Sequence, residues 1–177
     1  MRRRWAGGLA AIGLLLASAP AGAADIDCDA FIDKLRIGAA DLGVDFSHAL
    51  VVSRARSDTD VFDITTASEV EGDMSCRKGR LARFEARIFE PAAARVQSQF
   101  EAFQAAALRA ALGWEAGKAR ATVRAMAADA REYLKASRER GDVYISGKTE
   151  EHEAGGVSLG LIVTDTDSAF ILIGIEE

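Results

Sequence analysis

The sequence contains few of the side chains on which catalysis and metal binding most often depend. Only two histidines and two cysteines occur among its 177 residues. Histidine is the most frequent general base in enzymes, and the spacing of these residues matches no structural or catalytic zinc site. The HExxH, GxGxxG and P-loop patterns are also absent. The sequence therefore predicts a protein without a cofactor, and it favours binding over catalysis.

A long hydrophobic run is lacking as well. The longest apolar stretch near the start, residues 6–17, has 12 residues, whereas a membrane-spanning helix needs about 18 or more. Three arginines precede this stretch, and small residues follow it as far as Ala24. This order is typical of a cleaved secretory signal peptide. We therefore predict that residues 1–24 are a signal peptide and that residues 25–177 form one domain in the periplasm or outside the cell.

Two further features refine this prediction. No cysteine directly follows the small residues, so a lipoprotein anchor is not expected. Cleavage after Ala24 would remove three arginines and no acidic residue, which changes the net charge from −5 to −8. An acidic domain of this kind is a poor nonspecific binder of nucleic acid, and no later segment is predicted to span a membrane.

The two cysteines, Cys28 and Cys76, are predicted to form a disulfide. In an exported chain a pair of cysteines is usually oxidised. The alternative is a nucleophilic thiol assisted by His48 or His152, which the oxidising compartment disfavours.

The pattern of apolar residues predicts an α+β fold. A first helix runs from an N-cap at Asp27 to about Leu42, and two long helices, 91–112 and about 118–140, form an antiparallel hairpin. Pro91 is expected at the first helical position. Strands are expected before and after this hairpin, in the chain order α-β4-αα-β3: 49–55, 61–67, 69–76, 81–89, 143–148, 157–163 and 169–175. Short links between successive strands imply one antiparallel sheet of about seven strands.

Side-chain alternation predicts the register of two strand pairs. Around residues 78–80, a three-residue loop places Cys76 opposite Ala82, Met74 opposite Phe84 and Glu71 opposite Arg87, whereas a two-residue turn would put charges on the apolar face. In the last pair of strands, the alternation of apolar side chains places Leu159 opposite Ile173 and Leu161 opposite Ile171. Because the last strand is apolar on both sides, it is expected in the centre of the sheet or covered on both faces.

An acidic segment near the end of the chain is the weaker of two candidate sites. Carboxylates and an imidazole are possible ligands of a divalent metal, but their spacing fits no known metal site. A solvated hairpin loop is the preferred interpretation. The segment consists of Glu150, Glu151, His152 and Glu153.

A row of cations on the second long helix is the stronger candidate. At 100° per residue these side chains fall on one side of the helix, beside its apolar stripe. They are Arg120, Arg124, Arg131, Lys135 and Arg138, called the basic ridge below. The basic ridge predicts contact with an anionic partner or with membrane headgroups. The alternative is a solvated helix face whose cations pair with nearby acids.

These features favour a non-catalytic binding or interaction module. The second hypothesis is a carrier of a small apolar or anionic ligand, held between the helices and the sheet. A hydrolase-type enzyme without a recognisable motif is the third. Neither the partner nor the oligomeric state follows from the sequence.

Overall fold

The computed structural model describes residues 26–52, 59–142, 152–154 and 157–174. These residues form three helices and an antiparallel sheet, so the predicted α+β class is confirmed. The helices are α1 (Cys28–Asp41), α2 (Ala94–Leu112) and α3 (Ala116–Arg140). The strands are β1 (Phe46–Val52), β2 (Thr59–Thr66), β3 (Glu71–Arg77), β4 (Arg80–Phe89), β5 (His152–Ala154), β6 (Val157–Val163) and β7 (Asp167–Gly174).

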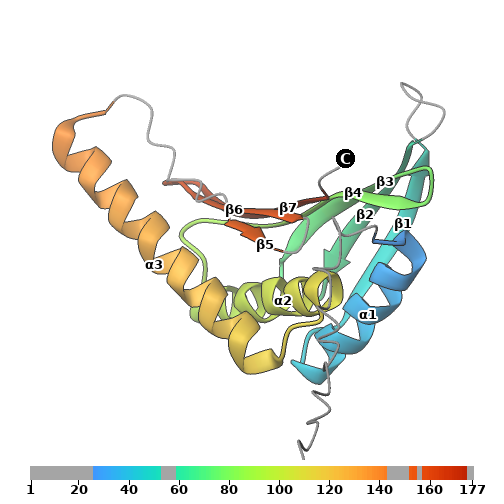
Figure 1. The fold of residues 1–177 in the computed structure, drawn as a ribbon. Helices are drawn as coiled ribbons and strands as arrows, with labels where there is room; N and C mark the ends of the chain where they lie inside the picture. The colour runs from blue at the N-terminus through green and yellow to red at the C-terminus, as the bar shows by residue number, and fades with distance from the viewer. Residues whose placement is uncertain (1–25, 53–58, 143–151, 155–156, 175–177) are drawn as a thin grey trace, which may run out of the picture.

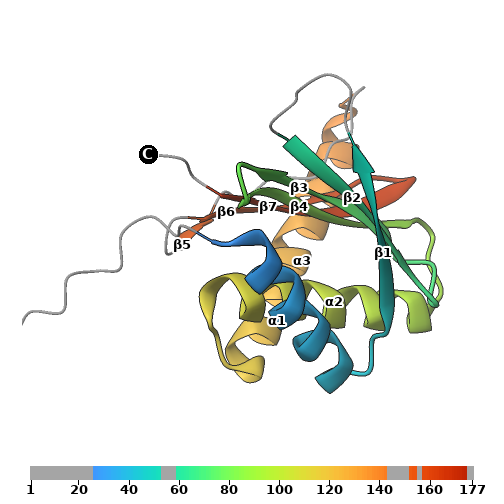
Figure 2. The ribbon, with the colours of Figure 1, turned by 90° about the vertical axis from the view of Figure 1, so that its right-hand side faces the viewer.

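The fold has two layers. The sheet has the order β1-β2-β3-β4-β7-β6-β5, and all three helices lie on the same face of it (Figures 1 and 2). The predicted central position of the last strand is confirmed, because β7 lies between β4 and β6. The predicted strand 143–148 lies outside the described residues. Residues 152–154, which we expected in a loop, form β5 at the edge of the sheet.

The core lies between the sheet and the helices. Phe84 of β4 is fully buried, and its ring packs edge-on against Phe31 of α1, Phe103 of α2 and Phe170 of β7. One aromatic ring thus joins the helical layer to the sheet. Helix α2 contacts α1, α3 and β4, which explains why its residues 102–108 are all buried.

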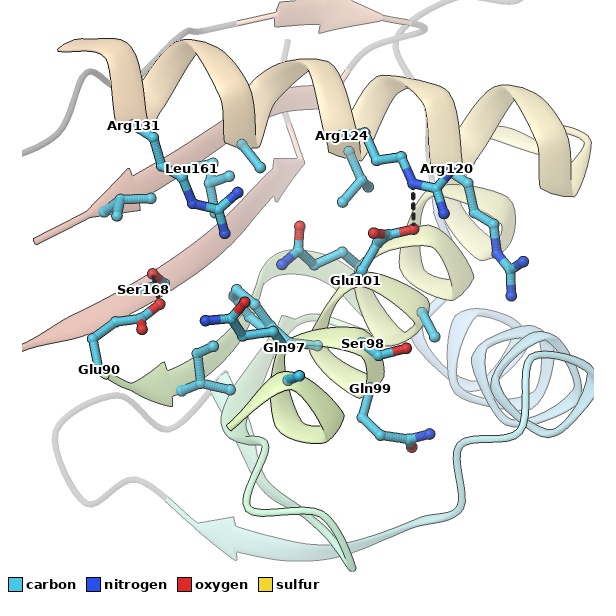
Figure 3. Close-up of a pocket in the computed structure, with 18 of the residues that line it drawn as sticks. Glu90, Gln97, Ser98, Gln99, Glu101, Arg120, Arg124, Arg131, Leu161 and Ser168 are labelled. Atoms are coloured by element: carbon cyan, nitrogen blue, oxygen red, sulfur yellow. Dashed lines mark hydrogen bonds and ion pairs between the residues drawn. The ribbon is translucent and has the colours of Figure 1, made fainter. Parts of the chain in front are cut away.

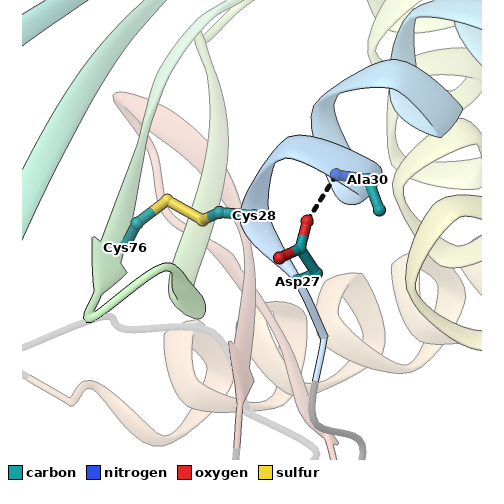
Figure 4. Close-up of a disulfide and its surroundings, with 4 residues drawn as sticks. All are labelled: Asp27, Cys28, Ala30 and Cys76. Atoms are coloured by element: carbon teal, nitrogen blue, oxygen red, sulfur yellow. Dashed lines mark hydrogen bonds between the residues drawn. A yellow bond between two sulfur atoms is a disulfide. The ribbon is translucent and has the colours of Figure 1, made fainter.

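The N-terminal helix is fixed to the sheet in two ways. The Asp27 carboxylate accepts a hydrogen bond from the Ala30 backbone N–H at 2.9 Å, which is the predicted cap. One residue later, the structure brings Cys28 and Cys76 to disulfide distance, with their Cα atoms 6.2 Å apart (Figure 4). Backbone hydrogen bonds from Cys28 N–H to the Gly79 carbonyl and from Leu81 N–H to the Ile26 carbonyl reinforce the attachment.

The β3–β4 hairpin corrects one detail of the predicted register. Met74 does pair with Phe84 and Glu71 with Arg87, as predicted. The turn, however, has two residues, Lys78 and Gly79, both with positive φ, as a type I′ turn requires. A β-bulge between Ser75 and Cys76 absorbs the extra residue, so Cys76 faces Leu81 instead of Ala82. The sequence-based prediction did not consider a β-bulge and placed the extra residue in the loop.

Two other predictions are wrong. In the β6–β7 pair, Leu159 faces Leu172 and Leu161 faces Phe170, one residue away from the predicted alignment. Phe170 and Leu172 therefore point into the core, and 45% of Ile173 is exposed on the helix-free face. Pro91 does not begin a helix either, because α2 starts at Ala94.

Candidate functional site: a cleft between α2, α3 and the sheet

Helix α3 does not lie flat along α2. It crosses α2 obliquely and runs on past it toward β6 (Figure 1). The elbow between the two helices contains Gly113, whose φ of +64° ends α2 in a left-handed conformation. Because the helices diverge from this elbow, they leave a cleft of about 390 Å³ between them and the sheet. Its size falls within the range of small-molecule sites, roughly 300–1,000 Å³.

The walls of the cleft combine apolar and charged side chains. The apolar part includes Ile88 of β4, Leu161 and Val163 of β6, Phe100 of α2 and Val123 of α3. The charged residues that line it are Glu90, Glu101, Arg120, Arg124 and Arg131 (Figure 3). A mixed lining of this kind suits a ligand with an apolar body and a polar group.

A second cavity of about 380 Å³ adjoins the cleft further along α3. Four residues line both cavities: Glu90, Gln97, Arg131 and Val163. Lys135 and Arg138 line only the second cavity. Each of the five residues of the basic ridge thus lines at least one of two adjoining cavities.

Three ridge cations already have acidic partners. Arg124 donates to Glu101 of α2 at 2.8 Å, and Arg138 forms an ion pair with Asp165 in the β6–β7 turn. The Lys135 ammonium lies 3.9 Å from a Glu139 oxygen. Within the described part of the chain, Arg120 and Arg131 form no ion pair.

Glu90 is held firmly on the side of the cleft opposite α3. One of its carboxylate oxygens accepts from the hydroxyl of Ser168 and the other from the Ala92 backbone N–H, each at 2.9 Å. Its own N–H donates to the Thr166 carbonyl at 2.8 Å. Both oxygens of this carboxylate are therefore fixed in position, with Arg131 on α3 across the cleft (Figure 3).

Gln104 is the most unusual residue of the cleft. Only 2% of it is exposed, and among the described residues its Oε1 atom has no hydrogen-bond partner. A buried polar atom without a partner costs about 1–3 kcal/mol. Gln104 is the only polar residue in the run 102–108, AFQAAAL, but helical periodicity alone does not single it out as a site residue.

The acidic segment is described only in part. Glu150 and Glu151 lie outside the described residues, and His152 and Glu153 belong to the edge strand β5. Among the residues that the structure describes, no group of three or more His, Cys, Asp or Glu side chains is placed to hold a metal ion. In the same ranges, no helix is long and apolar enough to cross a membrane.

One catalytic pattern that the sequence was not expected to contain is in fact present. Residues 156–160, GVSLG, match GxSxG, the nucleophile motif of many hydrolases, in which the serine occupies a sharp strand-to-helix turn. Here Ser158 lies within β6 and pairs with Ile173 of β7. It therefore lacks the exposed turn that the chemistry requires.

In comparisons with protein-family models, curated proteins and solved structures, we found no match to this chain. We therefore infer function from the geometry of the cleft.

Proposed function

We propose that this protein is an exported, non-catalytic binding protein that holds a small ligand in the cleft between α2, α3 and the sheet. The observation that carries the proposal is a cleft of ligand size whose walls combine apolar and charged side chains.

The structure thus favours the ligand-carrier hypothesis over a module that uses the basic ridge as an open interaction surface. Three ridge cations are ion-paired within the protein, so fewer charges are available to a large anionic surface. Two observations support export: the cysteines lie at disulfide distance, which fits an oxidising compartment, and residues 1–24 have the signal-peptide pattern.

Binding can be tested by native mass spectrometry of residues 25–177. We would use four probes that share a ten-carbon chain and differ in head group: decanoate, decanol, decylamine and decyl phosphate. We expect a one-to-one complex with at least one of them. Ala127→Phe, which places a large side chain in the cleft wall, should abolish that complex.

The matched control is Ala128→Phe, because Ala128 is the next residue on α3, is exposed and does not line the cleft. This variant should bind like the unchanged protein. Absence of any complex, or equal binding by Ala127→Phe and Ala128→Phe, would refute the proposal.

A further inference from the structure

We infer that helix α3 is a gate for the cleft: it swings away from the sheet about the elbow that joins it to α2, and the ion pair between Arg138 and Asp165 holds it closed. This inference rests on the proposed binding function, because it concerns how a ligand reaches that site. Three observations support it: the burial of the cleft walls, the few contacts of the second half of α3, and the position of the ion pair.

The apolar side chains of the cleft are closed off from water. Leu161 and Val163 of β6 are 3% and 5% exposed, and Ile88 of β4 is 1% exposed. Helix α3 forms the facing wall, since its Val123 and Arg131 line the same cleft, and Figure 3 shows the Arg131 side chain beside Leu161. A ligand that is to contact these apolar walls therefore needs α3 to move away from β6.

The second half of α3, residues 131–140, has little to hold it against the sheet. In this half only Leu134 and Ser137 are buried, and Figure 1 shows that it runs on past α2. Segments with few buried apolar contacts open at a lower free energy than the core of a protein. The second half of α3 is therefore the part of the cleft wall that can move while the core stays folded.

One ion pair fastens this half to the sheet. Arg138 contacts Asp165, which lies in the β6–β7 turn. Within the described part of the chain no other ion pair joins α3 to the sheet, because its remaining pairs are with α2 or with residues at its own C-terminal end. The side chains of Arg138 and Asp165 are 54% and 51% exposed. An ion pair so exposed is weak and is screened by salt, so it can break and form again as the gate opens and closes.

The elbow allows the swing. Gly113 ends α2 with a φ of +64°, and a few residues between two elements are enough to absorb a hinge rotation. At 1.5 Å per residue, Arg124 lies about 12 Å and Arg138 about 33 Å from the start of α3 at Ala116. By this lever, an opening of about 6 Å at Arg138 moves Arg124 by only about 2 Å. The long side chains of Arg124 and Glu101 can follow that shift, so their ion pair stays formed.

The gate can be tested without a ligand, by the reaction of one introduced thiol in residues 25–177 with N-ethylmaleimide. Leu161→Cys and Ile88→Cys each place a thiol in the cleft wall. Leu172→Cys is the matched control, because Leu172 is fully buried in the neighbouring strand β7 and lines neither cavity. Cys28 and Cys76 lie at disulfide distance and do not react once they are bonded. We expect the thiols at positions 161 and 88 to react at least about tenfold faster than the thiol at position 172.

The role of the ion pair is tested by adding Asp165→Asn to these variants. This change removes the charge but keeps the shape of the side chain, and it should raise the reaction rate at position 161 about two- to fivefold, the factor that corresponds to an exposed ion pair. The rate at position 172 should not change. Glu139→Gln is the control for charge, because it removes the same charge from a pair with Lys135 inside α3, and it should leave both rates unchanged.

Two results would show that α3 is not a gate. One is an equal reaction rate of the thiols in the cleft wall and at position 172, and the other is an equal effect of Asp165→Asn and Glu139→Gln at position 161. Either result leaves the proposed binding function intact, because that function is judged by complex formation in native mass spectrometry. If the thiols react as expected and none of the four decyl probes binds, the binding function fails while the motion of α3 stands.

Discussion

Removal of the Cys28–Cys76 bridge should cost this domain a large part of its stability. The two cysteines are 48 residues apart in the chain. In the chain-entropy model, cross-linking a loop of that length destabilises the unfolded state by about 4 kcal/mol. Small domains have total unfolding free energies of roughly 5–15 kcal/mol, so the loss should be easy to measure.

The folded state should tolerate the change. The hydrogen bonds between residues 26–28 and residues 79–81 remain when the sulfur atoms are removed, so α1 keeps its place on the sheet. We therefore expect Cys28→Ala/Cys76→Ala to fold and to show a lower unfolding free energy by about 4 kcal/mol in urea titrations followed by circular dichroism. The m-value should rise, because the unfolded chain without the bridge exposes more surface.

A control separates the cross-link from packing. Both cysteines are buried in the core, so their replacement by alanine also removes sulfur volume. Unchanged protein under reducing conditions loses only the bond and retains that volume. We expect it to lose nearly as much stability as the double variant. If the reduced protein and the double variant each lost less than about 1 kcal/mol, the chain-entropy reasoning would be refuted for this protein.

Three further predictions concern single substitutions that change stability. Gly72→Ala should destabilise the domain by about 2 kcal/mol or more, because a Cβ atom there would lie 2.0 Å from the Glu85 carbonyl oxygen. In the same urea titrations, Gly117→Ala should be neutral or stabilise by up to about 1 kcal/mol, since nothing lies within 4 Å of its Cβ position in helix α3. Equal effects of the two glycine substitutions on the unfolding free energy would contradict this reasoning. Asp27→Ala should lower the unfolding free energy by about 1 kcal/mol through loss of the hydrogen bond to the Ala30 N–H, and Asp27→Asn should retain most of that stability.

The sequence predicted the fold best where the pattern of apolar residues allowed only one arrangement of the chain. The stripe Phe31, Leu35 and Ala39 of α1 is buried as expected, because helical spacing leaves only one apolar face. The register of β3 with β4 was correct beyond the turn for the same reason: charged and apolar residues alternate strictly there.

Prediction failed where the pattern was ambiguous. Both sides of strand β7 carry large apolar residues, so the alternation of side chains did not determine which side faces the helices. The β6–β7 turn decides the register. The Thr164 hydroxyl accepts hydrogen bonds from the N–H groups of Thr166 and Asp167, and the Thr164 N–H donates to the Asp167 carbonyl, which closes a short turn. Side-chain turn chemistry of this kind competes with alternation.

The candidate site was predictable only in part. Helical periodicity alone placed the five basic-ridge residues on one side of α3. It did not indicate that Glu101 and Asp165, which come from α2 and from a turn of the sheet, would pair with two of them. Nor did it reveal the cleft, because the cleft results from the angle at which α3 crosses α2. Contacts between distant segments set that angle, and a one-dimensional pattern does not record them.

The β-bulge in the β3–β4 hairpin has a consequence for how the chain tolerates changes of length. Strand β4 contains one residue, Ala82, that has no partner in β3. Deletion of this residue would leave a regular two-residue hairpin with Met74 still opposite Phe84. An insertion or deletion elsewhere in β4 would instead exchange its buried and exposed sides. In evolution, single-residue length changes in this strand should therefore be confined to the neighbourhood of Ala82.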